Sequence, residues 1–221
     1  MSCNIPLLLQ KDCSEFLCTK SGVEFKNLPV KNIKVPMEQT NLESFDLIDK
    51  KEISVQEKGT GCVTYKNEKR YKLFVINYEN YVNSLPKRAQ QGIKRCDFLI
   101  YSENKKFFFA NELSTSRIDF SKEAHAIKQL SQTIKTMFNC KELENEIKTY
   151  KEKICIFSNR TQDIKTPHGM ADSFLTTPFM QNKLNPVQIE DIPEITELGF
   201  KYCKSSYIVL SDNFEFYKDI G

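Results

Sequence analysis

Residues 96–113 read CDFLIYSENKKFFFANEL, and this stretch decides the fold class. It holds two apolar runs, 96–101 and 106–113, joined by the polar residues 102–105. Runs rich in aromatic and branched side chains are typical of buried strands, and a short polar connection between two of them is typical of a hairpin. The stretch therefore predicts two antiparallel strands at the centre of the protein.

A long helix is predicted after the second strand. Ser121 is a suitable N-cap, and apolar side chains then recur at spacings of three and four residues: Ile127, Leu130, Ile134 and Met137. The charged segment 141–153 extends or follows this helix, and KICIFS (153–158) reads as a further buried strand. The order strand, hairpin, helix, strand predicts an α/β protein with a mixed central sheet, a crossover helix and flanking helices.

The parts of the chain around this centre are less regular. Strands are expected at 61–65, 71–77 and 206–211, a short helix at 41–49, and a basic polar connection at 79–92. We therefore predict three parts. They are an N-terminal elaboration (1–60), a nuclease-like α/β core (61–160) and a proline-rich C-terminal extension (161–221) that ends in a strand and packs on the same domain.

Composition narrows the class of protein. The chain has 221 residues, 40% of them apolar, which is enough for one domain with elaborations, and its net charge of +3 permits a nucleic-acid partner without requiring one. Eight cysteines form no Cys-x-x-Cys pair and are interpreted as reduced thiols, with a zinc site at Cys13 and Cys18 as the alternative. With no long apolar segment and no basic leader, the sequence predicts a cytoplasmic protein that does not span a membrane.

Two carboxylates occupy informative positions on the predicted hairpin. Asp97 lies near the start of the first strand and Glu112 near the end of the second. If the two ends of the polar turn pair with each other, Asp97 faces Ala110 and Arg95 faces Glu112. All four side chains then share one face of the sheet, because side chains alternate along a strand. Asp97 and Glu112 become diagonal neighbours with backbones about 7–8 Å apart, and their carboxylates are able to close on one Mg²⁺ or Mn²⁺. A three-residue turn would place them on opposite faces.

This arrangement resembles the PD-(D/E)xK nuclease superfamily, which has the restriction-endonuclease-like fold. The matching segments are KRCDFLI (94–100), FFFANEL (107–113) and the helix 124–137, under a third of the chain. The resemblance implies metal-dependent phosphodiester hydrolysis, with DNA preferred to RNA, possible roles in defence, restriction or repair, and a cation held by Asp97, Glu112 and the carbonyl of Leu113. It also implies that Gln129 lines the site.

The sequence departs from the superfamily pattern at one position. The lysine expected two residues after the glutamate is replaced by Ser114, whose hydroxyl carries no charge. Candidates for a relocated lysine are Lys122 and Lys128 on the helix and Lys94 before the first strand, and Lys128 is preferred because it precedes Gln129. The alternative is a catalytically inactive module that keeps the fold and binds nucleic acid or a partner protein; a homo-oligomer is compatible with the sequence.

Other polar residues near the hairpin have two interpretations each. The basic run Lys87, Arg88, Lys94 and Arg95 either binds a phosphate backbone or forms a solvated loop. Residues 115–117 (TSR) contact phosphate or belong to an ordinary connection, and His125 is either a chemical group or a surface residue. Asp97 and Glu112 themselves have the alternative interpretation of strand-end carboxylates in surface ion pairs, with Arg95 beside Glu112.

Overall fold

The predicted hairpin is present at the centre of the larger of two sheets. Its strands are β6 (Phe98–Ser102) and β7 (Phe107–Ser114), and they pair antiparallel. The structure is a computed structural model, and it describes residues 4–28, 30–48, 55–56, 61–114, 120–159, 188–211 and 217–218.

The large sheet is mixed, as predicted. Its strand order is β1-β5-β6-β7-β8-β10-β9, with the two-residue β12 as an eighth strand at the edge. β7 is antiparallel to β6 and parallel to β8, which in turn is parallel to β10. The other strands of this sheet are β1 (Met37–Thr40), β5 (Leu73–Asn77), β8 (Glu152–Asn159), β9 (Gln188–Glu190), β10 (Lys201–Lys204) and β12 (Tyr217–Lys218).

A small sheet has the strand order β11-β4-β2, with the two-residue β3 (Val55–Gln56) beside β2. β11 (Tyr207–Val209) lies in the predicted last strand and pairs with β4 (Val63–Lys66). The prediction of a helix at 41–49 is wrong, because β2 (Ser44–Leu47) pairs along β4 and buries Phe45 and Leu47. Pairing with a distant strand outweighs the local N-cap signal of this segment.

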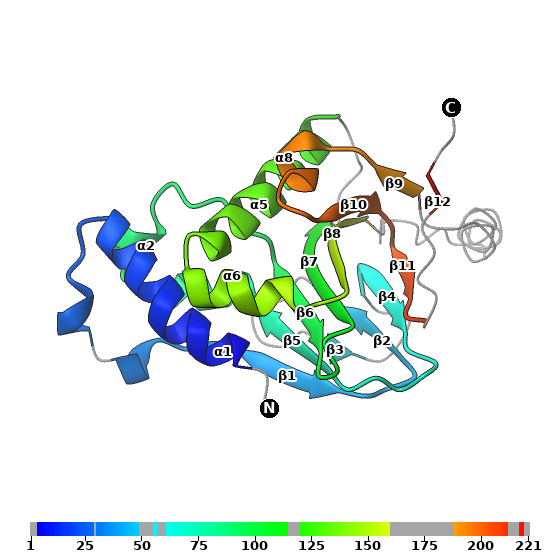
Figure 1. Cartoon of the computed structure of the whole chain (residues 1–221), viewed down its shortest axis with the longest axis horizontal. Helices are drawn as coiled ribbons and strands as arrows, with labels where there is room; N and C mark the ends of the chain where they lie inside the picture. The colour runs from blue at the N-terminus through cyan, green and yellow to red at the C-terminus, as the bar shows by residue number, and fades with distance from the viewer. Residues whose placement is uncertain are drawn as a thin grey trace, which may run out of the picture.

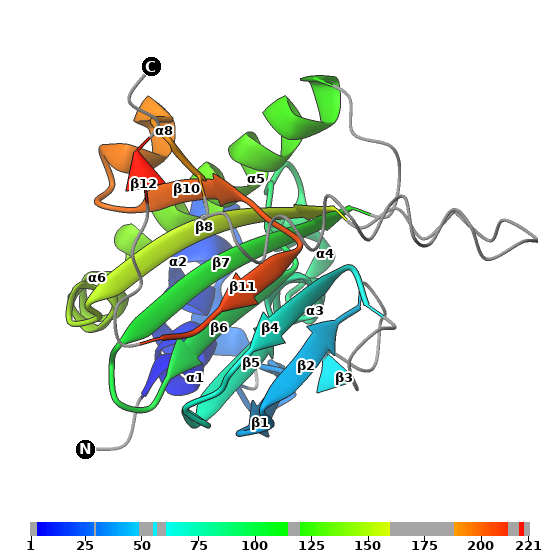
Figure 2. The same cartoon turned by 90° about the vertical axis from the view of Figure 1, so that its right-hand side faces the viewer.

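Helices cover one face of the large sheet, and the small sheet covers the other (Figures 1 and 2). The predicted crossover consists of α5 (Phe120–Phe138) and α6 (Lys141–Lys148), which connect β7 to β8. The basic connection predicted at 79–92 instead contains α3 (Tyr78–Asn83) and α4 (Lys87–Gln90). The remaining helical segments are α1 (Ile5–Leu8), the π-helical turn η1 (Leu9–Cys13), α2 (Ser14–Lys20), the 3-10 turns η2 (Phe25–Asn27) and η3 (Val30–Asn32), and α8 (Pro193–Thr196).

Two hydrophobic cores lie on opposite faces of the large sheet. Along the hairpin, Leu99 and Phe108 belong to the core beneath the helices, whereas Ile100 and Phe109 belong to the core beneath the small sheet. The predicted helix stripe is confirmed by Leu130, which is fully buried with Ile134 and Met137 in the first core. By the same alternation, Asp97 and Glu112 take positions on the helix-covered face.

The seven cysteines within the described residues are free and buried, as predicted for reduced thiols. Among those residues there is no cluster of three or more metal-ligating side chains of the histidine, cysteine, aspartate or glutamate type. No helix in the described ranges is both long and apolar enough to cross a membrane.

Candidate nuclease-like site

The register of the hairpin places the two carboxylates opposite each other. Phe98 pairs with Asn111 and Leu99 pairs with Ala110, so Asp97 and Glu112 occupy the next position along the ladder. The predicted pairing of Asp97 with Ala110 is therefore wrong by two residues. A shift of two residues keeps every side chain on its face, so the expected common face is retained.

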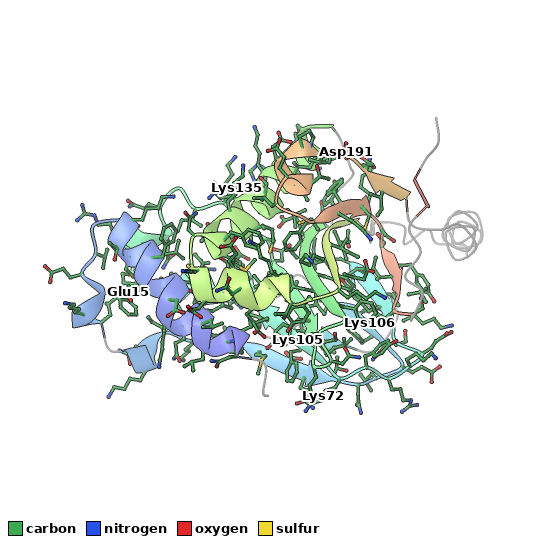
Figure 3. All side chains as sticks on the ribbon, viewed as in Figure 1. Glu15, Lys72, Lys105, Lys106, Lys135 and Asp191 are labelled. Atoms are coloured by element: carbon green, nitrogen blue, oxygen red, sulfur yellow. The ribbon has the colours of Figure 1, made fainter. Side chains whose placement is uncertain are left out.

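The turn explains this difference in register. Four residues, 103–106, separate the strands, and the Ser102 hydroxyl accepts hydrogen bonds from the backbone amides of Lys106 and Phe107, both at 2.9 Å. Lys105 adopts a left-handed conformation with φ 58°, and its ammonium lies 2.9 Å from Glu146 of α6. Figure 3 labels Lys105 at this turn, the end of the hairpin away from Asp97 and Glu112.

Asp97 is fixed by both its side chain and its backbone. Its carboxylate oxygen Oδ2 accepts a hydrogen bond of 2.6 Å from the backbone amide of Leu113, the residue after Glu112. Its carbonyl accepts a hydrogen bond of 2.8 Å from the amide of Tyr78, where α3 begins. The Asp97 carboxylate is thus directed across the hairpin toward the end of β7.

Glu112 is 8% exposed and pairs in register with Phe157 of the parallel strand β8. The pKa of the Cys96 thiol is affected by both carboxylates. Burial raises the pKa of Cys96 well above its ordinary value, and the negative charges of Glu112 and Asp97 raise this pKa further. Both carboxylates therefore act on one buried atom, as expected for groups close to each other.

A pocket of about 420 Å³ opens beside Glu112. It lies where the end of β7 meets the first turns of α5 and Phe157 of β8. The lining residues from β7 and α5 are Glu112, Leu113, Ser114, Ser121, Lys122, His125, Ala126 and Gln129. Three residues that the resemblance assigns to the site, Glu112, Leu113 and Gln129, thus line one pocket, whereas Asp97 is not among the lining residues.

The candidate lysines are placed differently from one another. Lys122 lines the pocket together with Glu112 and Ser114. Lys128, which the sequence favoured, is exposed and is not one of the lining residues, and Lys94 is likewise exposed outside the pocket. The ammonium that shares the pocket with Glu112 is therefore that of Lys122.

Gln129 lines the pocket and also forms a hydrogen bond with the segment that precedes Asp97. Its Nε2 donates a hydrogen bond of 2.9 Å to the carbonyl of Arg95. One turn further along α5, the Thr133 hydroxyl accepts a hydrogen bond of 2.9 Å from the amide of Cys96. These two bonds attach the segment before Asp97 to the helix, so Gln129 has a positioning role whatever else it contacts.

The predicted basic run does not act as one group. Arg95 donates through Nη2 to Asn83 at 2.7 Å and lies 3.7 Å from Glu79, so its guanidinium is held at α3 and not, as the alternative interpretation of the carboxylates required, at Glu112. Lys87 and Arg88 are exposed on α4. The segment 115–117 lies outside the described residues.

The donor atoms at Asp97 and Glu112 suit a hard cation. Two carboxylates and the backbone carbonyl of Leu113 are all oxygen donors, which Mg²⁺ and Mn²⁺ prefer and which do not favour zinc. Mg²⁺ usually retains several waters and takes only one or two protein carboxylates. The small number of acidic side chains is therefore compatible with a magnesium site.

Two polar residues of the pocket were interpreted differently from the sequence: Ser121 as an N-cap, and His125 as either a chemical group or a surface residue. Together with Gln129 they follow a spacing of four residues along α5, which places them on one side of the helix. That spacing was the available signal.

Comparisons with known proteins give no independent identification. No protein-family model, no curated protein and no solved structure matches this chain. A functional assignment therefore depends on the geometry and chemistry of the site.

Proposed function

We propose that this chain is a divalent-metal-dependent nuclease of the restriction-endonuclease-like fold, acting on DNA in preference to RNA. One observation carries the proposal. Asp97 and Glu112 occupy opposed positions at the open end of a central hairpin, and Glu112 lines a pocket there together with Lys122. Adjacent carboxylates at the mouth of a polar pocket are suited to binding a cation and a phosphodiester together.

The residues have distinct roles in this proposal. Asp97, Glu112 and the carbonyl of Leu113 would hold the cation, which when bound stabilises developing charge on the phosphate and lowers the pKa of its water. Lys122 supplies the positive charge that the superfamily places at the position of Ser114. An ammonium fixed near the reacting phosphate stabilises negative charge in the transition state without any reorganisation.

A second candidate function is a module that binds nucleic acid or a partner protein without cleaving. Ser114 favours this alternative, because a serine hydroxyl cannot replace an ammonium. The direct hydrogen bond from the Leu113 amide also satisfies one oxygen of Asp97 without a cation.

Cleavage assays with matched lysine variants test the first function. Single- and double-stranded DNA and RNA are incubated with Mg²⁺ or Mn²⁺, and initial rates are compared for wild type, Glu112→Gln, Lys122→Ala and Lys128→Ala. We expect Glu112→Gln and Lys122→Ala to slow cleavage about 10²–10³-fold, the usual effect of losing one charge-stabilising group. Lys128→Ala removes the same group from the same helix outside the pocket and should leave the rate unchanged.

One result would contradict this function, and a second would contradict only the role of Lys122. A wild type inert on every substrate with either metal favours the binding module. Equal loss of activity in the two lysine variants assigns the effect to the overall charge of α5 instead of the pocket.

A further inference from the structure

A second pocket, of about 320 Å³, lies on the helical side of the molecule. It forms where the end of α2, the segment after α4 and the middle of α5 meet. Its lining residues are Leu17, Lys20, Ser21, Arg88, Gln91, Gly92, Ile93, Gln132 and Thr136. None of these residues is acidic, and two of them are basic.

The charges of this pocket are available to a ligand. Lys20 and Arg88 are both exposed, and within the described part of the chain neither forms an ion pair with an acidic side chain. Gln91 and Gln132 add amide donors to the same lining. A guanidinium, an ammonium and amide groups around one hollow form a set of donors suited to a phosphate.

The end of α2 lies beside Arg88, at a distance that leaves room for ordinary contact. Gly22 has φ +67°, and a Cβ at this position would lie 3.6 Å from Arg88 Nη2. The carbonyls of Cys18 and Thr19 accept hydrogen bonds from the amides of residues 21–23, so these partial negative charges are already satisfied. Within the described residues, the Arg88 guanidinium forms no side-chain hydrogen bond and no ion pair.

The two pockets open along one stripe of α5. His125 and Gln129 line the first pocket, and Gln132 and Thr136 line the second, at successive spacings of four, three and four residues. Such spacings keep side chains on one side of a helix. The midpoints of the two pairs, positions 127 and 134, lie seven residues apart, which corresponds to about 10 Å of helix, on the order of three phosphate steps at about 3.4 Å of rise along one strand.

We propose that the pocket of Lys20 and Arg88 binds a backbone phosphate of the nucleic-acid strand whose scissile phosphate lies at Asp97 and Glu112. This inference deepens the proposed function and rests on its choice of nucleic acid as ligand. Between the pockets the strand passes over the segment that Gln129 and Thr133 hold against α5. Contacts to phosphate position a strand without reading its sequence, so this pocket sets the register of cleavage and contributes affinity for any sequence.

Binding without cleavage tests the inference. Affinity of the Glu112→Gln protein for a labelled single-stranded DNA is measured by fluorescence anisotropy in EDTA over a range of salt concentrations, with Lys20→Glu, Arg88→Glu and Lys87→Glu added one at a time. Lys87 shares α4 with Arg88 but does not line the pocket. We expect each pocket variant to weaken binding about tenfold and to lower the salt slope by about 0.7, and Lys87→Glu to change both far less.

Further arms separate the possible sources of the phosphate. Duplex DNA and RNA are compared with the single strand, and inorganic phosphate and a mononucleotide serve as competitors. If a mononucleotide binds as tightly as the oligonucleotide, the proposal that the pocket binds a nucleic-acid strand is overturned, and the pocket is assigned to a free phosphate ligand. If all three charge reversals weaken binding equally, the proposal of a specific phosphate pocket is overturned in favour of a diffuse basic surface. Lys20→Gln and Arg88→Gln, which are milder changes, give the same comparison if a charge reversal prevents folding.

The outcomes distinguish this inference from the proposed function. Cleavage by wild type with unaltered binding in the Lys20 and Arg88 variants contradicts only the phosphate pocket. Binding that depends on these residues in a protein that never cleaves contradicts only the nuclease.

Discussion

Ser114 ends β7 and lines the pocket together with Glu112 and Lys122. If the ammonium of Lys122 replaces the missing lysine, Ser114→Lys should restore most of the cleavage rate lost in Lys122→Ala, because it returns a positive charge to the same pocket. Initial rates of the double variant measure this. Ser114→Gln is the control, since it adds length without charge; equal rescue by glutamine would show that charge is not the cause.

Asn111 stabilises the buried contact between the two sheets. Its side-chain oxygen Oδ1 accepts a hydrogen bond of 3.1 Å from the Tyr65 hydroxyl. Its side-chain nitrogen Nδ2 donates to the Ile156 carbonyl at 3.0 Å and to Ser158 Oγ at 2.9 Å. We expect Asn111→Ala to lower the free energy of unfolding by about 2–4 kcal/mol, because it leaves buried polar partners unsatisfied. Urea denaturation measures the loss. Asn145→Ala, an exposed change on α6, should have little effect, and an equal loss there would rule out this explanation.

At the scale of elements, the small sheet depends on the close approach of Gly61 to β2. Its amide donates to Asp46 Oδ2 at 2.9 Å, and a Cβ at this position would lie 2.4 Å from the carbonyl oxygen of Leu47. Gly61→Ala should therefore destabilise the protein by more than about 2 kcal/mol, since backbone has to move. Thermal denaturation compares it with Gly199→Ala, which meets no atom within 4 Å and has only the cost of φ +76°, about 1 kcal/mol. Similar losses in both variants would contradict the steric cause.

The elements with strong periodicity were predictable, and those decided by distant contacts were not. The hairpin and α5 follow from apolar spacing within a single segment. The helix expected at 41–49 was wrong because β2 is stabilised by pairing with β4. The hairpin register was wrong because the Ser102 hydroxyl caps the turn, and a side-chain hydrogen bond of this kind leaves no mark on the strand pattern.

The candidate site shows the same division. Alternation along the strands is sufficient to place Asp97 and Glu112 on one face. The sequence could also have favoured Lys122 over Lys128. Lys122 precedes Gln129 by seven residues, or two helical turns, and so lies on the same side of the helix, whereas Lys128 is the immediate neighbour of Gln129 and is rotated from it by about 100°. The sequence could not show that Lys20 and Arg88 line one pocket. The helices α2 and α4 are far apart in the sequence and meet only through tertiary packing.

Across the whole molecule, buried thiols and phenols should make stability depend on alkaline pH. Burial raises the pKa of the Cys203 thiol from 9.0 to about 12, and it also raises the pKa of Cys96, Cys155 and Tyr65. The folded state holds these protons more tightly than the unfolded state does. Stability is therefore fully present below about pH 9 and falls above it by about 1.4 kcal/mol per pH unit for each thiol, and the contribution of the Tyr65 phenol begins to fall only above about pH 10.

Urea unfolding in the presence of a reductant, measured at neutral and alkaline pH, checks this dependence. Cys203→Ala serves as the comparison and should give a shallower decline between about pH 9 and about pH 12, whatever its stability at neutral pH. A decline that is identical in the two proteins would remove Cys203 from the cause.

The position of β7 also has a consequence for hydrogen–deuterium exchange. β7 is an interior strand of the large sheet, pairs with β6 on one side and with β8 along all eight residues on the other, and both of its faces are covered. Its amides should exchange only when the sheet opens as a whole, whereas those of the edge strand β1 exchange through local opening. Glu112 is thus carried by one of the slowest-exchanging segments of the molecule, and the carboxylate keeps its place through the local fluctuations that reach the edges.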